Sequence, residues 1–183
     1  MIYEFCAENV TLLEKAMQAG ARRIELCDNL AVGGTTPSYG VTKAAVELAA
    51  NYDTTIMTMI RPHGGDFVYN ELEIAIMLED IRLAAQAGSQ GVVFGALTGD
   101  KKLDKPNLEK LISASKGMEI VFHMAFDELS DEDQLEAIDW LSQAGVTRIL
   151  TRAGVSGDSL EKRFAHYHRI LEHAKGKIEI LPG

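Results

Sequence analysis

The residues best suited to chemistry lie in the segment Ile60-Arg61-Pro62-His63-Gly64-Gly65-Asp66-Phe67, which combines a permanent cation, an imidazole and a carboxylate. An apolar, β-branched stretch (54–60) precedes them and a helix-like stretch (70–87) follows, so we predict a loop between a strand and a helix. Pro62 stiffens the strand exit, and Gly64-Gly65 allow a sharp turn close to a ligand. Such loops are where α/β proteins place functional groups.

Glutamate and cysteine alternate in two earlier strand-like stretches. Glu4 and Cys6 lie in one, and Glu25 and Cys27 lie in the next. Because the side chains of a strand alternate between two faces, each Glu–Cys pair shares one face, and the apolar neighbours share the other. A polar second face is unlike an open parallel sheet, which helices cover on both sides. The pattern therefore favours a barrel interior.

A third group follows in Phe122-His123-Met124-Ala125-Phe126-Asp127. A barrel would gather these strand ends at one mouth, where Arg61, His123 and the carboxylates suit acid–base work on a small anionic substrate. Crowded carboxylates repel one another, so one could hold a proton near neutral pH. The candidate catalytic residues are Glu4, Glu25, Arg61, His123 and Asp127, and the candidate ligand-binding residues are His63 and Asp66.

Each candidate also has a structural explanation that the sequence leaves open. Glu4 and Glu25 could simply pair with Arg61. His123 could be a hydrogen-bonded histidine at a strand end. Asp66 could bond loop amides and Asp127 could act as a cap. Cys6 and Cys27 could be small buried hydrophobic residues.

Strand-like and helix-like stretches alternate along the whole chain. The expected strands are 2–7, 23–27, 54–60, 91–97, 119–123, 147–151 and 178–181. The tripeptide Gln-Ala-Gly recurs at 18–20, 86–88 and 143–145, each time where a helix should end in a left-handed glycine. Asn9 and Asn107 are candidate caps for two of the helices.

This alternation implies a parallel sheet, as a closed (β/α)8 barrel or an open doubly wound sheet. We predict an α/β fold of the TIM-barrel type, in which residues 1–183 form a single domain that lacks the eighth strand and the C-terminal part. No Gly-x-Gly-x-x-Gly motif follows the first strand, so we expect no nucleotide cofactor.

Composition limits the partners. With 27 acidic and 18 basic residues the net charge is -9, which argues against nucleic acid or an anionic membrane surface. The N-terminus carries Glu4 and Glu8 rather than the basic start of a signal peptide. No apolar stretch approaches the roughly 20 residues that span a bilayer. Two cysteines are too few for a disulfide scaffold, so we predict a soluble cytoplasmic protein with reduced thiols.

Six motifs occur in an order that resembles one known family. They are Glu-Leu-Cys (25–27), Gly-Gly-Thr-Thr-Pro-Ser-Tyr-Gly (33–40), Ile-Arg-Pro-His-Gly-Gly-Asp-Phe (60–67), Phe-Gly-Ala-Leu (94–97), Phe-His-Met-Ala-Phe-Asp (122–127) and Arg-Ile-Leu-Thr (148–151). Together they resemble the CutC copper homeostasis family. The resemblance implies a TIM-barrel-like fold, a cytoplasmic location, a role in copper handling and a homo-oligomer, but no settled reaction.

The chain departs from the family pattern at three places. Met124 stands where the family usually has arginine, which removes one cation from the expected mouth. His63 stands where arginine is frequent. Family members also continue past the seventh strand into a glycine-rich turn, an eighth strand and a terminal helical part.

Two functional hypotheses remain. In the first, the protein handles copper and binds Cu(I) through Cys6 and Cys27, since this soft ion selects sulfur. Met57, Met59 and Met124 could add thioether ligands or serve as core filler. In the second, it is an enzyme in which Arg61 binds an anionic metabolite while His123 and Glu25 exchange protons. A regulatory barrel that binds ligand without turnover is a third, weaker possibility. The sequence leaves open whether the protein is an enzyme.

Overall fold

The structure is a computed structural model that describes residues 2–154 and 157–183. The chain divides into two compact units. The first consists of Met1–Asp66, Asn70–Phe94 and Ser113–Glu119. The second consists of Phe67–Tyr69, Gly95–Ile112 and Ile120–Gly183.

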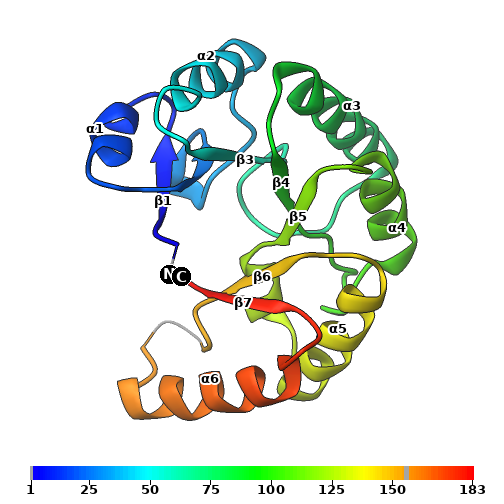
Figure 1. The fold of residues 1–183 in the computed structure, drawn as a ribbon. Coiled ribbons are helices and arrows are strands. Elements are labelled where there is room, and N and C mark those ends of the chain that lie inside the picture. Colours follow the sequence, from blue (N-terminus) through cyan, green and yellow to red (C-terminus); the bar gives the residue numbers. More distant parts are fainter. Residues whose placement is uncertain (1, 155–156) are drawn as a thin grey trace. The chain divides into compact units, whose positions relative to one another are not determined.

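Parallel strands alternate with helices in the first unit. Its elements are β1 (Glu4–Glu8), α1 (Leu13–Gln18), β2 (Arg23–Cys27), the 3₁₀ turn η1 (Leu30–Val32), α2 (Tyr39–Ala49), β3 (Thr55–Met59), α3 (Glu71–Ala87) and β4 (Gly91–Phe94). Each strand pairs in parallel with the next. Helices α1, α2 and α3 lie on one side of these strands (Figure 1). This is the strand–helix alternation that the sequence predicts.

The core of this unit forms where α1 and α2 pack on the strands. Its buried members are Ala7, Leu13, Met17, Ala21, Ile24, Leu26, Ala45, Ala49 and Ile56. Ile24 and Leu26 are fully buried in this cluster. Because strand residues alternate, Arg23, Glu25 and Cys27 must point to the opposite side of β2. The apolar core thus holds β2 so that it presents a polar row.

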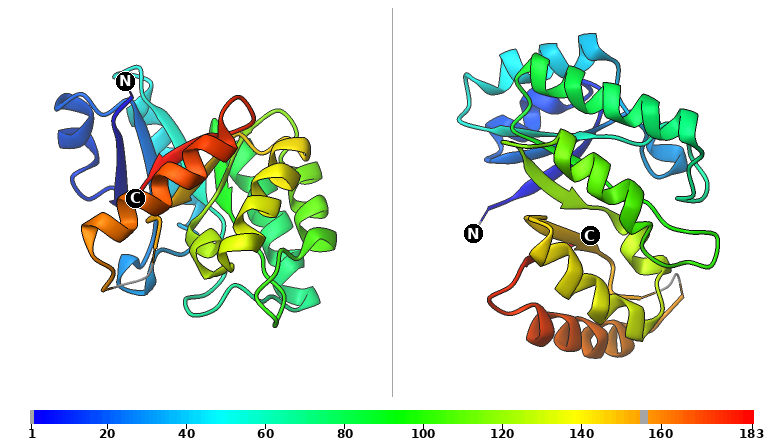
Figure 2. Two further views of the ribbon diagram at one scale, coloured as in Figure 1. Left: turned by 90° about the horizontal axis from the view of Figure 1, so that it is seen from below. Right: turned by 90° about the vertical axis from the view of Figure 1, so that its right-hand side faces the viewer.

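The second unit repeats the pattern. It contains α4 (Lys105–Ala114) up to Ile112, β5 (Glu119–Phe122) from Ile120, the 3₁₀ turn η2 (Met124–Glu128), α5 (Asp131–Gln143), β6 (Arg148–Thr151), α6 (Leu160–Ala174) and β7 (Glu179–Pro182). Strands β5, β6 and β7 pair in parallel. Helices α5 and α6 run side by side (Figures 1 and 2). Seven strands are therefore found in the described part of the chain, as predicted.

The three Gln-Ala-Gly repeats end helices as predicted. Gly20, Gly88 and Gly145 have φ of 100°, 92° and 92°, the left-handed region where a side chain is strained. The next strand begins a few residues after each glycine, at Arg23, Gly91 and Arg148. Each glycine thus turns the chain from a helix back into the sheet.

Both predicted helix caps are wrong. Helix α1 begins only at Leu13, and Asn9 instead donates its side-chain amide to Asp28 at 2.9 Å, which ties the ends of β1 and β2 together. Helix α4 begins at Lys105, two residues before Asn107, and the Asp104 carboxylate accepts from the Asn107 N–H at 3.3 Å. In both cases the asparagine donates a hydrogen bond to a nearby aspartate instead of capping the helix.

Helix α3 begins with a reciprocal capping box. Asn70 Oδ1 accepts from the backbone N–H groups of Leu72 and Glu73 at 2.9 and 3.0 Å, and Glu73 Oε2 accepts from the Asn70 N–H at 2.8 Å. Replacing Asn70 by alanine should lower the free energy of unfolding by about 1 kcal/mol, because the first-turn donors lose their acceptor. Urea denaturation measures this. Asn51→Ala, at an exposed position outside a helix start, is the control. Equal midpoints for the two variants would contradict the prediction.

Candidate functional site

A carboxylate lies between two thiols in the first unit. Cys6 Sγ and Cys27 Sγ each lie 3.6 Å from Glu25 Oε1. The ligand atoms of Cys6, Glu25 and Cys27 all lie within 4.8 Å of one another. Cys27 is fully buried and Glu25 is 6% exposed, whereas Cys6 is exposed. The cluster therefore has one open side, at Cys6.

The register of β1 and β2 produces this cluster. Cys6 stands opposite Glu25, and Cys27 stands opposite Glu8. The two cysteines are thus placed diagonally across the strand pair rather than side by side. Glu25 and Cys27 share a face of β2 because they are two residues apart. The carboxylate consequently stands beside one thiol along its own strand and faces the other thiol across the ladder.

Burial sets the electrostatics of the cluster. The pKa of Glu25 is raised from 4.5 to about 7, chiefly by removal from water and also by the negative charge of Glu4, while the hydrogen bonds of the two thiols oppose the rise. The pKa of Cys27 is raised well above its usual range by its hydrogen bond with Cys6, by burial and by the nearby Glu25 charge. Without a bound cation, the cluster thus favours neutral groups near pH 7.

The loop that follows β2 lies against Cys27. The point where a Cβ would stand on Gly34 is 3.1 Å from Cys27 Sγ and 3.6 Å from the Met59 ε-methyl carbon. The φ of Gly34 is 89°, in the region that favours glycine. Sequence reasoning did not single out Gly34. The diglycine at 33–34 is the signal for a close backbone approach that could have done so.

Arg61 fastens the same loop. Its guanidinium donates to the carbonyls of Val32 and Gly34 at 2.9 and 3.0 Å and to that of Gly65 at 2.8 Å. The side chain is buried, since the residue is only 3% exposed. These bonds join the loop after β2 to the loop after β3. They favour a structural role for Arg61, and its predicted role in binding an anion stays a prediction.

The other predicted residues of the first unit take part in local contacts. Glu4 forms an ion pair with Arg23 at 3.1 Å, and both side chains are at most 10% exposed. Arg23 was not among the residues predicted from sequence, although its spacing from Glu25 and Cys27 places it in the same row on β2. His63 contacts the Gly64 carbonyl at 2.9 Å and the Glu73 carboxylate at 3.2 Å. Asp66 is exposed in the same loop. A ligand-binding role for His63 and Asp66 stays a prediction.

His123 lies at the end of β5 in the second unit. Its Nδ1 accepts from the Ala125 N–H at 3.1 Å, and its ring centroid is 4.8 Å from that of Phe67. The point where a Cβ would stand on Gly95 is 2.8 Å from this Nδ1. The histidine is therefore fixed by its own cap, by an aromatic neighbour and by a glycine. These contacts agree with the structural alternative, and a catalytic role stays a prediction.

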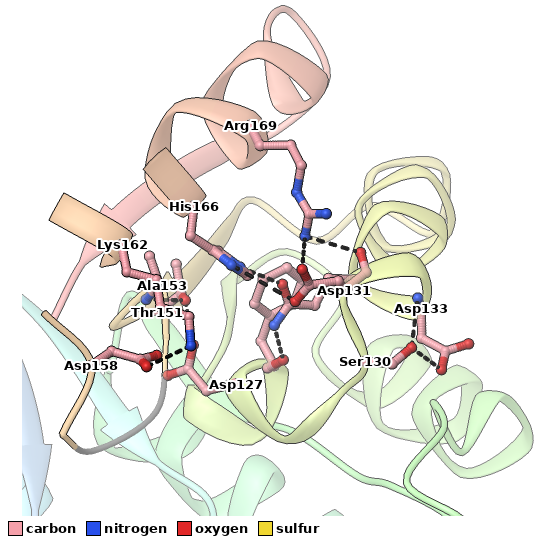
Figure 3. A network of polar contacts seen from close by, with 12 residues as sticks. Asp127, Ser130, Asp131, Asp133, Thr151, Ala153, Asp158, Lys162, His166 and Arg169 are labelled. Carbon is pink, nitrogen blue, oxygen red and sulfur yellow. Dashed lines mark hydrogen bonds and ion pairs between the residues drawn. The ribbon is translucent and has the colours of Figure 1, made fainter. Parts of the chain in front are cut away.

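Asp127 binds the end of β6. Its carboxylate accepts from the Thr151 hydroxyl and, at 3.0 Å, from the Arg152 N–H. Figure 3 shows Asp127 and Thr151 close to a group of ion pairs, in which His166 and Arg169 of α6 face Asp131 of α5. The Arg169–Asp131 ion pair spans 3.0 Å. Asp127 thus caps a strand end, which was its structural alternative.

Parallel strands that alternate with helices define an α/β class, and known structures identify its type. The chain superposes on an aldolase with a TM-score of 0.69 at 15% identity, over 98% of this chain and 77% of the other. At this identity the likeness concerns the fold alone. It confirms the predicted TIM-barrel type of fold.

Closer relatives identify the family. The model of the CutC family matches residues 1–183. A CutC family protein of Enterococcus faecalis is 51% identical over all of this chain and 88% of its own length. A copper homeostasis protein cutC homolog of Homo sapiens is 40% identical over all of this chain and 64% of its own. A crystal structure of CutC from Streptococcus agalactiae matches with a TM-score of 0.94 at 45% identity, over 98% of this chain and 86% of that one. The chain belongs to the CutC family.

Proposed function

We propose that this protein handles copper and binds one Cu(I) ion through Cys6 and Cys27. The observation that carries the proposal is the convergence of the two thiols on Glu25, with all three ligand atoms within 4.8 Å of one another. Thiolate sulfur is the donor that selects Cu(I) from harder ions. The human relative's name, copper homeostasis protein, supports the same function.

The spacing of the donors fits an ion held between two sulfurs. Metal–thiolate bonds are about 2.3 Å long, as for zinc, so two of them in line span roughly 4.6 Å. The sulfur atoms of Cys6 and Cys27 lie within 4.8 Å of each other. Little movement of the strands would therefore be needed to bind the ion.

The chemistry of binding also fits the neighbouring carboxylate. A metal binds thiolates, so each thiol must release its proton. Glu25 Oε1 already contacts both sulfur atoms at 3.6 Å and is placed to accept one of the two protons, while the exposed Cys6 can release the other to water. A bound Cu(I) would also replace one of the two positive charges that leave with the thiol protons, which matters because Cys27 is fully buried.

Removal of both thiols tests the proposal. The wild-type chain should take up close to one equivalent of Cu(I) in a competition titration against a chromophoric Cu(I) chelator under anaerobic, reducing conditions. Cys6→Ser combined with Cys27→Ser should abolish this uptake, because the chain contains no other cysteine. Each single variant should bind more weakly than the wild type. Circular dichroism verifies that the variants fold. Full uptake by the double variant would end the proposal.

The proposal includes a reducing, cytoplasmic location and a homo-oligomer. Both cysteines are free thiols, which suits a reducing compartment. None of the helices in the described residues combines the length and apolar character that a membrane crossing requires. Fractionation of cells would test the location. Light scattering of the purified chain would test the oligomer, and a mass equal to one chain would contradict it.

A further inference from the structure

We propose that Met59 supplies a third sulfur ligand to the copper ion, so that the site is a thioether joined to two thiolates. This inference rests on the proposed function and extends it to a residue beyond the cysteine pair. Met59 is 3% exposed at the end of β3. Its thioether is a soft donor of the kind that Cu(I) prefers.

The strand register places Met59 beside Cys27. Leu26 of β2 stands opposite Thr58 of β3, so the next residues along the two strands, Cys27 and Met59, are neighbours. Both follow the same alternation as Glu25 and Met57, which stand opposite each other. Met59 therefore lies on the face of the sheet that carries the two thiols.

The glycine above Cys27 brings the two sulfur-bearing side chains to one space. The point where a Cβ would stand on Gly34 is 3.1 Å from Cys27 Sγ and 3.6 Å from the Met59 ε-methyl carbon. The end of the Met59 side chain and the thiol of Cys27 thus border the same point. A methionine side chain has three rotatable bonds, so its sulfur can turn toward an ion there without moving the strand.

Charge favours a thioether over a further anionic ligand. Two thiolates and Cu(I) together carry one negative charge, and Glu25 lies in contact with both sulfurs. An additional buried anion would be unfavourable. A neutral thioether completes a soft donor set without adding charge, and carboxylate oxygen is a poor match for Cu(I). Glu25 is then left to hold one of the protons that the thiols release.

Met57 provides a matched control on the same face of the same strand. It is fully buried, and its Sδ is 2.7 Å from the point where a Cβ would stand on Gly91. Its sulfur is therefore packed against β4. Met57→Leu and Met59→Leu remove a thioether from similarly buried positions, and only the second should affect copper.

The test is a Cu(I) titration of Met59→Leu, Met57→Leu and wild type against the same chromophoric chelator. Met59→Leu should weaken Cu(I) binding by at least about tenfold, because losing a ligand should cost no less than losing an outer partner that only supports a ligand. Met57→Leu should stay within about twofold of wild type. X-ray absorption at the copper edge should count three sulfur neighbours in wild type and two in Met59→Leu.

A measurement on the unmodified chain covers the case in which Met59→Leu folds poorly. With ¹³C-labelled methionine methyl groups, Cu(I) should shift the Met59 resonance and leave that of Met57 in place. An unshifted Met59 methyl, or two sulfur neighbours in wild type, would overturn the inference. If copper uptake needs the two cysteines but ignores Met59→Leu, the proposed function stands and only this inference falls. If wild type takes up no Cu(I), both fall.

Discussion

Replacing Arg61 by methionine is expected to lower the free energy of unfolding by about 3 kcal/mol. The reason is that the guanidinium donates to three backbone carbonyls, those of Val32, Gly34 and Gly65. A buried acceptor left without a donor costs about 1–3 kcal/mol. Gly34 is buried and would bear the full penalty, whereas Val32 and Gly65 are exposed and can bond to water. Lysine should not restore the loss, because it lacks the planar fork of donors.

The same substitution should uncover Cys27. Arg61 holds the carbonyl of Gly34, and Gly34 lies against the Cys27 thiol. In a Cys6→Ser background, Cys27 is the only thiol, so its reaction with a colorimetric disulfide reagent reports on the loop. That reaction should be slow in the parent and at least about tenfold faster with Arg61→Met, since exposure limits the reactivity of a thiol.

Arg22 offers a matched control for this experiment. It donates to a single carbonyl, that of Tyr52, at an exposed site. Arg22→Met should change the free energy of unfolding by less than about 0.5 kcal/mol, as is usual for surface substitutions. Urea denaturation measures all variants. An Arg61→Met variant that is as stable as Arg22→Met, with Cys27 as slow to react as in the parent, would show that the arginine does not fasten the loop.

Replacing Glu25 by glutamine is expected to stabilise the protein above pH 7. Burial raises the pKa of Glu25 from 4.5 to about 7, so the folded protein favours the protonated carboxyl. Below pH 4.5 the group is protonated in the folded and unfolded chains, and its ionisation costs nothing. Between pH 4.5 and 7 only the unfolded chain ionises, so stability falls as pH rises. Above pH 7 the full loss, about 3 kcal/mol, is present.

Glutamine is neutral at every pH and nearly the same shape, so it escapes this loss. Its side-chain oxygen can still accept from the thiols of Cys6 and Cys27. Urea denaturation of wild type and Glu25→Gln at pH 5 and pH 8 measures the effect. The variant should gain on wild type by about 2–3 kcal/mol more at pH 8 than at pH 5. Comparing the two proteins at each pH removes the titration of all other groups. A difference that does not change with pH would contradict the prediction.

Much of the fold could be predicted because it depends on short-range patterns. The glycines that end the helices at Gly20, Gly88 and Gly145 are recognisable from sequence, since only glycine tolerates that conformation well. The alternation of Glu25 and Cys27 with Ile24 and Leu26 also predicts which side chains share a face of β2. These signals need no knowledge of the partner strand.

The features that sequence reasoning missed depend on what lies across a strand or loop. The sequence predicts Asn9 as a helix cap, but its side-chain amide donates to the Asp28 carboxylate at the end of the neighbouring strand. Arg23 shares the row of Glu25, yet its pairing with Glu4 follows from the register of β1 and β2. To predict that Gly34 lies against Cys27, one must know the path of the loop after β2. Local sequence patterns do not show which residues of distant segments lie close together.

If the site binds copper as proposed, the unequal exposure of the two cysteines would give the binding a direction. Cys6 is exposed and Cys27 is fully buried under the loop after β2. An arriving ion would meet the outer sulfur first and be drawn inward, and on departure the inner bond would have to break before the outer one. Transfer of the ion to another thiol carrier would then proceed stepwise by ligand exchange at Cys6. The lifetime of the copper complex would be set by the rate at which the bond to Cys27 breaks.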